Sequence, residues 1–400
     1  MSFTLDQSQI EAVERAVERP FSIINGGAGC GKTTIIREIV NRLEQEGEIV
    51  KLCSPTGKAA ARLRQASGCP ACTVHSLLRF DGERFAAGPF AGSSVIIDES
   101  SMMDSALLAE IAKRHPDRLV LVGDQAQLPP VGAGQPFHDV IRFYPETVRT
   151  LTTCYRNAEA VFRAASAIRA GRMPELHAES AHEKWDVHAT GEPEETQRVI
   201  LEWVRQGVFD FKQDIILAPK NGERNAETGE FPPCTVNRLN LEIVKLLNPR
   251  NPAERRRFLP GDRVIVTKNN AEKDIWNGTT GTVARTDMDG GLFMALDPLG
   301  DEEPPEVRLS REETADLQHA YALTVHKSQG SQYRKVLFVS LMRDRFILDR
   351  SLVYTAVTRT RCECLVAGQL PALAQALGSS KGKETVIQLV ARRKTCGNAK

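Results

Sequence analysis

The sequence lacks the features that mark several special classes of protein. None of its apolar runs approaches the roughly 20 residues that a bilayer-spanning helix needs. Its first residues do not join a basic segment to an apolar one, as an export signal would. Internal repeats and low-complexity segments are also missing. The apolar fraction of 41% and the charged fraction of 26% are those of an ordinary globular protein. We therefore expect a cytoplasmic protein of about two to three domains, nucleoid-associated or phage-encoded, with no membrane partner.

The sequence also lacks a large charge of either sign and an ordered cysteine framework. With a net charge of +1, the chain cannot bind nucleic acid through bulk charge, so such binding needs a local basic groove. The nine cysteines are scattered, and a reducing cytosol disfavours disulfides. Cys69 and Cys72 have metal-ligand spacing, with His75 close behind. Because a closed zinc site normally needs a second such pair, we interpret them as ordinary thiols.

The most specific motif follows an apolar run over residues 21–24. It matches the P-loop pattern G-x-x-x-x-G-K-[ST] and lies between a predicted strand and a predicted helix. In such a loop, backbone N–H groups and a helix N-terminus surround the phosphates. Lys32 would contact the β- and γ-phosphates, and the Thr33 hydroxyl would be a ligand for Mg²⁺. The predicted nucleotide-binding residues are Gly26, Gly27, Ala28, Gly29, Cys30, Gly31, Lys32, Thr33 and Thr34.

Two further predicted strands end in polar residues of matching chemistry. The strand over residues 94–97 runs into Asp98 and Glu99. Asp98 can hold Mg²⁺ opposite the P-loop, and Glu99 can act as general base on the attacking water. The strand over residues 118–122 leads into a loop that contains Gln127, whose side chain could sense a γ-phosphate. Taken alone, that loop could equally be structural.

In their order along the chain, these segments resemble the motifs of superfamily 1 helicases, and most of all their RecD-like and Dda-like branch. No single later block is specific, but the complete order makes coincidence negligible. The similar blocks are residues 5–9 (Q motif), 26–34 (motif I), 54–60 (motif Ia), 73–77 (the following block), 98–102 (motif II), 123–130 (motif III), 151–156 (motif IV), 322–330 (motif V) and 353–361 (motif VI).

The resemblance implies an ATP site assembled from both halves of the chain. Arg156 and Arg359 lie far from the P-loop in sequence, so their action as arginine fingers would close a cleft between two lobes. Arg361 fits a surface or structural ion pair better. The implied catalytic residues are Lys32, Glu99, Gln127, Arg156 and Arg359, and Gln9, which would read the adenine, Asp98 and Gly330 complete the nucleotide site.

The resemblance also implies a track for single-stranded nucleic acid. Contacts mainly to phosphates would give little sequence preference and a strong salt dependence. For either histidine alone, a buried structural role would be the better interpretation. The candidates are Thr56, Lys58, Thr73 and His75 in the first lobe and Thr324, His326, Lys327 and Ser328 in the second.

We expect an α/β fold with two RecA-like P-loop lobes, a small inserted SH3-like β-barrel and a short hairpin (pin) insertion. Alternating strands and helices predict the parallel sheets, and short strands joined by turns predict the β-barrel. Residues 79–93 form either a duplex-separating pin or a surface loop with a small aromatic cluster. The expected limits are 1–150 for the first lobe, 151–258 and 313–375 for the second, 259–312 for the β-barrel, and 376–400 for a basic tail that is solvated or touches phosphates.

These features predict an ATP-dependent DNA helicase or translocase that uses Mg²⁺ and moves 5′ to 3′, the direction implied by the resemblance. Its partners would be single-stranded DNA and single/double-strand junctions, with proteins of replication, repair or recombination as candidates. An RNA helicase or a nucleoprotein-remodelling translocase is an alternative, because contacts to a 2′-hydroxyl cannot be read from the sequence. A nucleotide-switched binding protein is a third, which the intact Lys32 and Glu99 disfavour.

Overall fold

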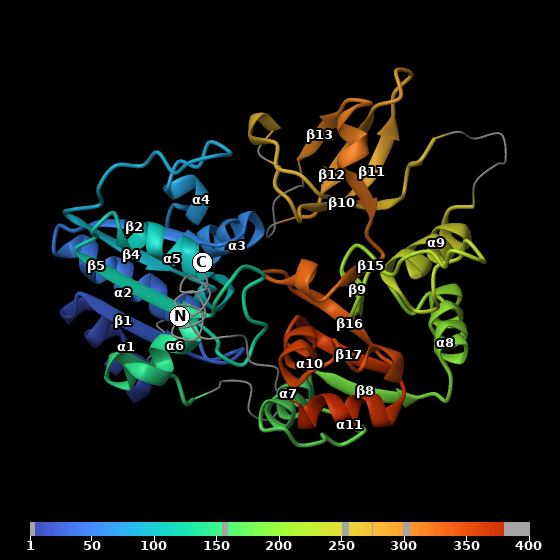
Figure 1. The fold of residues 1–400 in the computed structure, drawn as a ribbon, viewed down its shortest axis with the longest axis horizontal. Coiled ribbons are helices and arrows are strands. Elements are labelled where there is room, and N and C mark those ends of the chain that lie inside the picture. The colour runs from blue at the N-terminus through green and yellow to red at the C-terminus, as the bar shows by residue number, and fades with distance from the viewer. Residues whose placement is uncertain (1–4, 154–158, 250–255, 274, 299–304, 380–400) are drawn as a thin grey trace, which may run out of the picture. The chain divides into compact units, whose positions relative to one another are not determined.

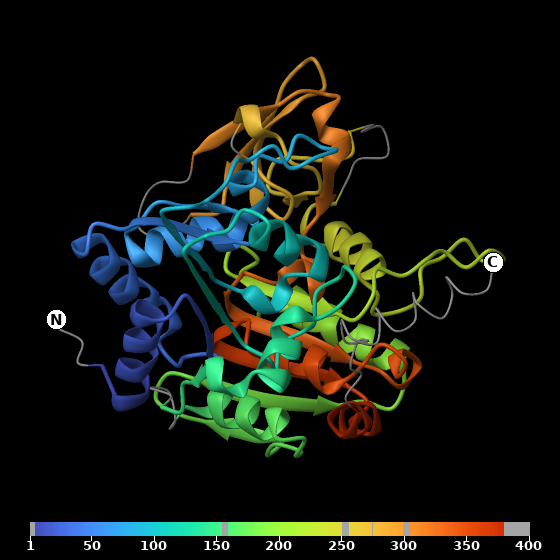
Figure 2. The same cartoon turned by 60° about the vertical axis from the view of Figure 1, so that its left-hand side comes forward.

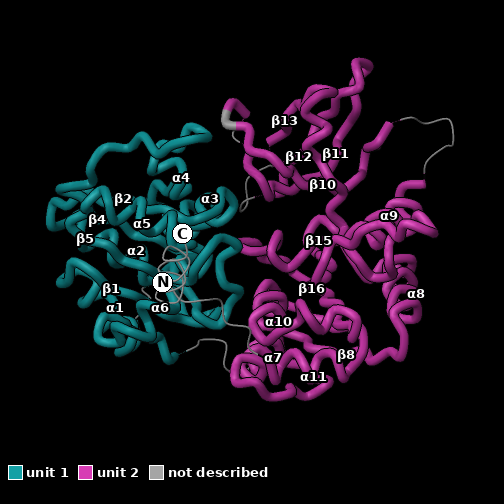
Figure 3. Tube along the Cα trace, viewed as in Figure 1, with its two compact units in different colours: residues 1–157, 381–400 teal, residues 158–380 magenta. Residues whose placement is uncertain are grey.

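The computed structural model of the chain describes residues 5–153, 159–249, 256–273, 275–298 and 305–379. The chain divides into two compact units, and the division falls at residue 157 (Figure 3). Unit 1 contains the described residues before this point and unit 2 those after it. No helix among the described residues has the length and apolar character needed to cross a membrane.

Unit 1 is built on a six-stranded parallel sheet of order β3-β2-β4-β5-β1-β6 (Figure 1). The strands are β1 (Phe21–Asn25), β2 (Ile49–Ser54), β3 (Ala71–Thr73), β4 (Ser93–Ile97), β5 (Arg118–Gly123) and β6 (Val148–Thr150). The helices are α1 (Gln7–Glu18), α2 (Lys32–Gln45), α3 (Gly57–Ser67), α4 (Val74–Leu77), α5 (Ser105–Ala112) and α6 (Pro136–Phe143), with 3₁₀ turns η1 (Ser100–Met102) and η2 (Pro145–Thr147). Because the strands are parallel, the carboxyl ends of the neighbours β4, β5 and β1 meet at one edge.

The central strands of this sheet form because their apolar runs are buried on both faces, as in covered parallel sheets. Ile23, Ile97 and Leu121 each retain no more than 1% of their exposed surface and join one hydrophobic cluster. Side-chain caps fix where helices start: Asp6 begins α1 through a capping box with Gln9. The sheet is therefore a rigid support for the loops at its carboxyl edge.

Unit 2 contains a second six-stranded sheet, of order β15-β9-β16-β17-β8-β7, in which only β7 is antiparallel to its neighbour. Figure 2 shows strands from distant parts of the sequence side by side, β8 and β9 in green with β16 and β17 in orange and red. The strands are β7 (His177–Glu179), β8 (Lys184–Ala189), β9 (Asp214–Ala218), β15 (Ala322–Thr324), β16 (Tyr333–Ser340) and β17 (Thr360–Gly368). The helices are α7 (Ala160–Arg169), α8 (Pro193–Arg205), α9 (Val236–Leu247), α10 (Arg350–Val357) and α11 (Leu370–Gly378), with 3₁₀ turns η5 (His326–Ser328) and η6 (Met342–Asp344).

A separate five-stranded antiparallel sheet, of order β13-β12-β11-β10-β14, is inserted in unit 2. Its core includes Val264, Val283, Met294 and Leu317. The fifth strand lies beyond the expected limit of residue 312, because Leu317 is buried in this core and its strand pairs with β10. The strands are β10 (Arg263–Val266), β11 (Thr280–Thr286), β12 (Leu292–Leu296), β13 (Glu306–Leu309) and β14 (Leu317–His319), with 3₁₀ turns η3 (Ala271–Lys273) and η4 (Glu313–Asp316).

A buried polar joint fixes this small β-domain on unit 2. The Asn240 side chain on α9 accepts the backbone N–H groups of Tyr321 (3.0 Å) and Ala322 (2.9 Å). Its amide donates to the carbonyl oxygens of His319 (3.1 Å) and Ala322 (3.0 Å). One side chain therefore satisfies four backbone groups where the chain returns from the β-domain, which rigidifies the connection.

Candidate nucleotide and nucleic-acid site

The P-loop leaves β1 at Gly26, where an added side chain would crowd Leu151. A Cβ atom there would lie 2.8 Å from Cδ1 of Leu151. Gly29 and Gly31 have φ angles of 79° and 78°, in the left-handed region that favours glycine. Gly31 is the N-cap of α2, which begins at Lys32. The loop therefore ends on a helix N-terminus, the arrangement that binds phosphate.

Lys32 lies folded over its own loop. Its Nζ donates to the carbonyl oxygens of Gly26 (2.7 Å) and Gly27 (3.1 Å). An ammonium in this position can exchange the carbonyl groups for phosphate oxygens without leaving the loop. Thr33 and Thr34 are half-buried in the first turn of α2.

Gln9 is tied to the P-loop. It is only 2% exposed, and its side-chain amide donates to the carbonyl of Cys30 (3.2 Å). Its Oε1 accepts the N–H of Asp6 (3.1 Å) within the capping box of α1. The side chain thus anchors α1 to the loop, and its predicted reading of an adenine stays a prediction.

The two carboxylates after β4 form a strained and partly unsatisfied pair. Glu99 has a φ of 53°, and its N–H donates to Oδ1 of Asp98 (2.8 Å). Its Oε2 is buried with no hydrogen-bond partner in the described part of the chain. Burial and the neighbouring Glu99 raise the pKa of Asp98 to about 6, against the opposing charges of Lys32 and Arg62. An orphaned oxygen beside a buried carboxylate suits a hydrated divalent cation, so the residues fit Mg²⁺.

Gln127 is held in a tight turn at the end of β5. Its side chain is 3% exposed, and its N–H donates to the carbonyl of Asp124 (3.2 Å). The Asp124 carboxylate accepts the N–H of Ala126 (3.0 Å). The turn begins beside the P-loop, because the N–H of Gly26 donates to the carbonyl of Gly123 (2.9 Å).

The predicted nucleic-acid residues of unit 1 lie at two neighbouring helix N-termini. Thr56 is the N-cap of α3 and accepts the N–H of Ala59 (3.2 Å). Thr73 is the N-cap of α4 and accepts the N–H of Ser76 (3.0 Å). Because Ser54 and Thr73 are register partners on β2 and β3, the two caps leave adjacent strands. Two positive helix ends, with Lys58 on α3 and His75 on α4, can attract phosphates.

Residues 79–93, expected to form either a pin or a surface loop, contain an antiparallel bridge between Phe80 and Phe85. Beside it the N–H of Ala86 donates to the carbonyl of Arg79 (3.1 Å). The rings of Phe80 and Phe85 lie 4.8 Å apart and both contact His75, with centroids at 5.5 and 5.9 Å. Phe80 remains 41% exposed. The segment therefore places an aromatic cluster on a predicted nucleic-acid residue.

The predicted nucleic-acid residues of unit 2 follow β15. Thr324 Oγ1 accepts the N–H of Lys327 (3.3 Å), whose Nζ donates to Gln318 (2.9 Å). Burial lowers the pKa of Lys327. His326 is exposed, whereas Ser328 is buried and its hydroxyl donates to the backbone of the same turn (2.8 Å). Ser328 thus shapes the turn, and Thr324 is also buried (7% exposed), so His326 and Lys327 are the side chains that a ligand can reach.

Arg359 and Arg361 differ sharply in burial. Arg359 is 3% exposed and its guanidinium donates to Thr355 (3.1 Å), Thr358 (3.3 Å) and Ser331 (3.4 Å), all neutral oxygens. Within the described ranges it has no carboxylate partner. A buried cation without a counter-charge is stabilised by an arriving anion. Arg361 is exposed on β17.

The structure brings one group of predicted residues together and leaves others apart. The P-loop, Asp98, Glu99 and Gln127 follow the neighbouring strands β1, β4 and β5 of unit 1. Gly330, with a φ of 74°, and Arg359 belong to unit 2, and Arg156 lies outside the described residues. The two-lobed ATP site therefore stays a prediction.

One charged residue near this site escaped the sequence interpretation. The positive charge of Arg62 lowers the pKa of Asp98. Arg62 lies four residues after Lys58 on α3, so Arg62 and Lys58 occupy one face of the helix. That spacing was the only signal available in the sequence.

The cysteines with metal-ligand spacing are free thiols. Cys72 pairs in register with Cys53 across β2 and β3, and burial raises the pKa of both. The described ranges contain no group of three or more residues that could hold a metal through His, Cys, Asp or Glu side chains.

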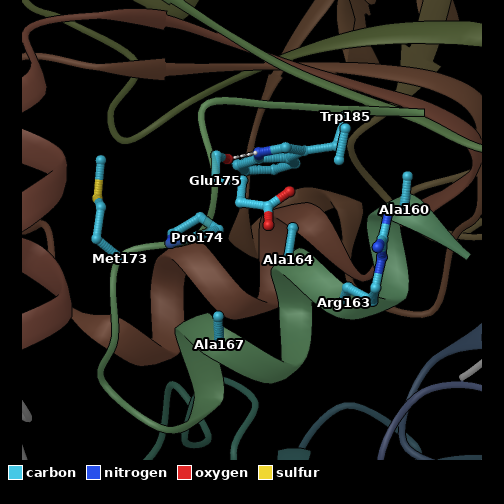
Figure 4. Close-up of a pocket in the computed structure, with 9 residues that line it drawn as sticks. Ala160, Arg163, Ala164, Ala167, Met173, Pro174, Glu175 and Trp185 are labelled. Carbon is cyan, nitrogen blue, oxygen red and sulfur yellow. Dashed lines mark hydrogen bonds between the residues drawn. The ribbon is translucent and has the colours of Figure 1, made fainter. Parts of the chain in front are cut away.

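A cavity of about 210 Å³ in unit 2 is separate from all these residues. Figure 4 shows its walls, made by small residues of α7, including Ala164 and Ala167, and by Trp185. The indole N–H of Trp185 donates to the carbonyl of Glu175 (2.7 Å) and closes one side. None of the predicted site residues lines this cavity.

Comparison with protein families identifies two matching segments. Residues 4–191 match a family described as AAA domain, and residues 319–367 match the UvrD-like helicase C-terminal domain. The first segment contains the predicted motifs of unit 1, and the second contains predicted motifs V and VI in full.

Several curated proteins are similar over most of the chain. The ATP-dependent RecD2 DNA helicase of Deinococcus radiodurans is 33% identical over 379 residues, which are 92% of this chain and 50% of that protein. The RecBCD enzyme subunit RecD of Mycolicibacterium smegmatis is 29% identical over 90% of this chain and 71% of that protein. The chain thus spans about half the length of the Deinococcus relative.

Solved structures of Pif1 helicases have the same fold. One, from a study of DNA unwinding at forked double-stranded DNA, has a TM-score of 0.57 and 18% identity, and covers 99% of this chain and 98% of its own. Another, Pif1 from Bacteroides with ADP-AlF3 and single-stranded DNA, has a TM-score of 0.56 and 17% identity, and covers 100% and 98%. The predicted mixed α/β fold with parallel sheets is confirmed, and the two sheets fit two RecA-like lobes.

Proposed function

We propose that the chain, which is similar to RecD helicases over 90% or more of its length, is an ATP-driven motor of the RecD-like branch of superfamily 1 that moves 5′ to 3′ along single-stranded DNA and unwinds duplex. One observation carries this proposal: the P-loop, the Asp98–Glu99 pair and Gln127 leave three neighbouring parallel strands of unit 1 at one edge. Phosphate binding, metal ligation and water activation can then occur within one site.

In this proposal each side chain has one chemical task. Thr33 and Asp98 hold Mg²⁺, which when bound neutralises charge on the β- and γ-phosphates. Lys32 exchanges its two carbonyl contacts for phosphate oxygens. The unpartnered Oε2 of Glu99 accepts a proton from the attacking water. Gln127 contacts the γ-phosphate and couples its presence to the conformation of the neighbouring loops.

Arg359 supports a site that includes the second unit. Its buried guanidinium is bonded only to neutral oxygens within the described residues, so an anionic γ-phosphate would supply the missing counter-charge. We infer that Arg359, with Gly330 and Arg156, completes the ATP site when the two units close on the nucleotide. Hydrolysis would remove this attraction and let the units separate.

The domain organisation that goes with this function is also a proposal. Residues 1–150 would form the first RecA-like lobe, and residues 151–258 with the segment up to 375 the second. The five-stranded sheet that is inserted in the sequence of the second lobe would be the SH3-like domain, with β14 included. The bridge between Phe80 and Phe85 would be a shortened pin that separates the duplex.

Single-stranded DNA and junctions would be the substrates. The N-caps Thr56 and Thr73, with Lys58 and His75, would hold phosphates on unit 1, and His326 and Lys327 would do so on unit 2, with Thr324 and Ser328 supporting their turn. Alternate gripping by the two units would move the strand. The curated RecD relatives include subunits of the RecBCD enzyme, so we propose proteins of DNA recombination or repair as partners.

The proposal is tested by ATP turnover with and without single-stranded DNA. Wild-type protein should hydrolyse ATP with Mg²⁺ and be stimulated by the DNA. Lys32→Ala should abolish turnover, because it removes the charge that contacts the β- and γ-phosphates. Lys245→Ala, which removes an exposed lysine of α9, is the matched control. Unchanged turnover in Lys32→Ala would show that the site is misassigned.

A further inference from the structure

A hydrogen-bonded clamp holds the loop that carries Gln127. This loop leaves β5 after Gly123, and the P-loop leaves β1 after Asn25. The two residues are register partners, so both loops start level on adjacent strands. Asn25 is 1% exposed, and its Oδ1 accepts the N–H of Gln125 (3.1 Å). A side chain from the P-loop strand thus fixes the backbone of the neighbouring loop.

His138 on α6 holds Gln125 from its other backbone group. Its Nε2 lies 2.8 Å from the carbonyl oxygen of Gln125, so the ring donates there. Its Nδ1 is buried and has no partner in the described part of the chain. Burial lowers the pKa of His138, so the ring is neutral near pH 7 and carries its one proton on Nε2.

The parts that carry the clamp cannot shift easily. A Cβ atom on Gly123 would lie 2.9 Å from Cζ of Phe137 and 3.1 Å from the N atom of Ser101. The helix with His138, the end of β5 and the turn after Glu99 are therefore packed without spare room. Gln127 follows two residues later and bonds back to Asp124 (3.2 Å), so a fixed Gln125 fixes Gln127.

We propose that Asn25 and His138 are positioning residues that set Gln127 at the distance from the P-loop where it can meet a γ-phosphate. The inference rests on the proposed ATPase function. The side chains of Asn25 and His138 bond only the backbone of Gln125, and the side chain of Gln125 itself is exposed and takes no part in the clamp. The clamp therefore acts on the path of the loop and leaves ATP binding by Lys32 unchanged.

The test compares two substitutions of His138 in the full chain. His138→Phe keeps a ring but removes the donor, and His138→Gln keeps a donor at a similar reach. We expect His138→Phe to lower the DNA-stimulated kcat about 3- to 10-fold, the worth of one net hydrogen bond. KM for ATP and Kd for single-stranded DNA should stay within about two-fold, and His138→Gln should restore kcat.

A second variant keeps the inference testable if His138→Phe melts below the assay temperature. Asn25→Leu is close in volume but leaves the N–H of Gln125 without an acceptor, so kcat should fall about 5- to 20-fold, again with KM little changed. In the double variant the losses should be less than multiplicative, because both act on one loop.

The outcomes separate this inference from the proposed function. A wild-type protein without DNA-stimulated turnover would overturn both. A stimulated wild type with unchanged kcat in His138→Phe and Asn25→Leu would overturn the clamp alone. An equal loss in His138→Gln and His138→Phe would do so as well, since it would assign the residue a role in packing only.

Discussion

Replacement of Glu99 by glutamine isolates the proposed general base. The substitution is isosteric, so packing at the end of β4 should be preserved. The buried Oε2 of Glu99 has no partner within the described residues, so no structural hydrogen bond is lost there. The change also removes a negative charge that raises the pKa of Asp98, which favours the ionised carboxylate. Binding of ATP and Mg²⁺ should therefore survive.

The expected loss lies in the chemical step alone. General-base catalysis contributes about 10²- to 10⁴-fold, which corresponds to about 3 to 5 kcal/mol of barrier. Phosphate release should be measured at saturating single-stranded DNA, with binding of a fluorescent ATP analogue in parallel. Glu14→Gln, an exposed position of α1, controls for loss of one charge. Turnover in Glu99→Gln within about three-fold of wild type would refute the general-base assignment.

Three other perturbations test separate parts of the account. Phe80→Ala opens the aromatic cluster with Phe85 and should impair unwinding while DNA-stimulated ATPase stays near wild type; equal losses would indicate a folding role. Lys327→Ala should weaken single-strand binding and lower the slope of log Kd against log salt by about 0.7, and an unchanged slope would exclude a phosphate contact. Asn240→Leu removes four hydrogen bonds to backbone groups, three of them buried, and should lower the free energy of unfolding by about 2 to 5 kcal/mol in urea titrations, whereas no change would contradict the buried joint.

The strands that carry the nucleotide motifs could be predicted from the sequence because they are continuous apolar runs. The strands expected over residues 94–97 and 118–122 are observed as Ser93–Ile97 and Arg118–Gly123. The helix expected directly after the P-loop is observed as Lys32–Gln45, since its apolar residues, such as Ile36 and Ile39, are buried. The apolar pattern of a single segment was sufficient to predict these elements, because the pattern itself shows which of their residues are buried.

Features that depend on contact between distant segments could not be predicted. The clamp on Gln125 requires the register of β1 against β5, and Asn25 is 100 residues away from it in sequence. The three-residue strand β14 is too short to have a pattern, and only its pairing with β10 assigns it to the small sheet. For residues 79–93 the sequence left a pin and a surface loop with an aromatic cluster as alternatives, and the contact of Phe80 and Phe85 with His75 is visible only in the structure.

The central claim is tested most directly by unwinding of DNA duplexes that carry either a 5′ or a 3′ single-stranded tail, with ATP and Mg²⁺. The account predicts that wild-type protein unwinds the 5′-tailed duplex and leaves the 3′-tailed one intact, and that Glu99→Gln unwinds neither. Unwinding of the 3′-tailed duplex alone would contradict the proposed direction. Failure on both duplexes, with ATPase still stimulated by single strands, would contradict the helicase and leave a translocase.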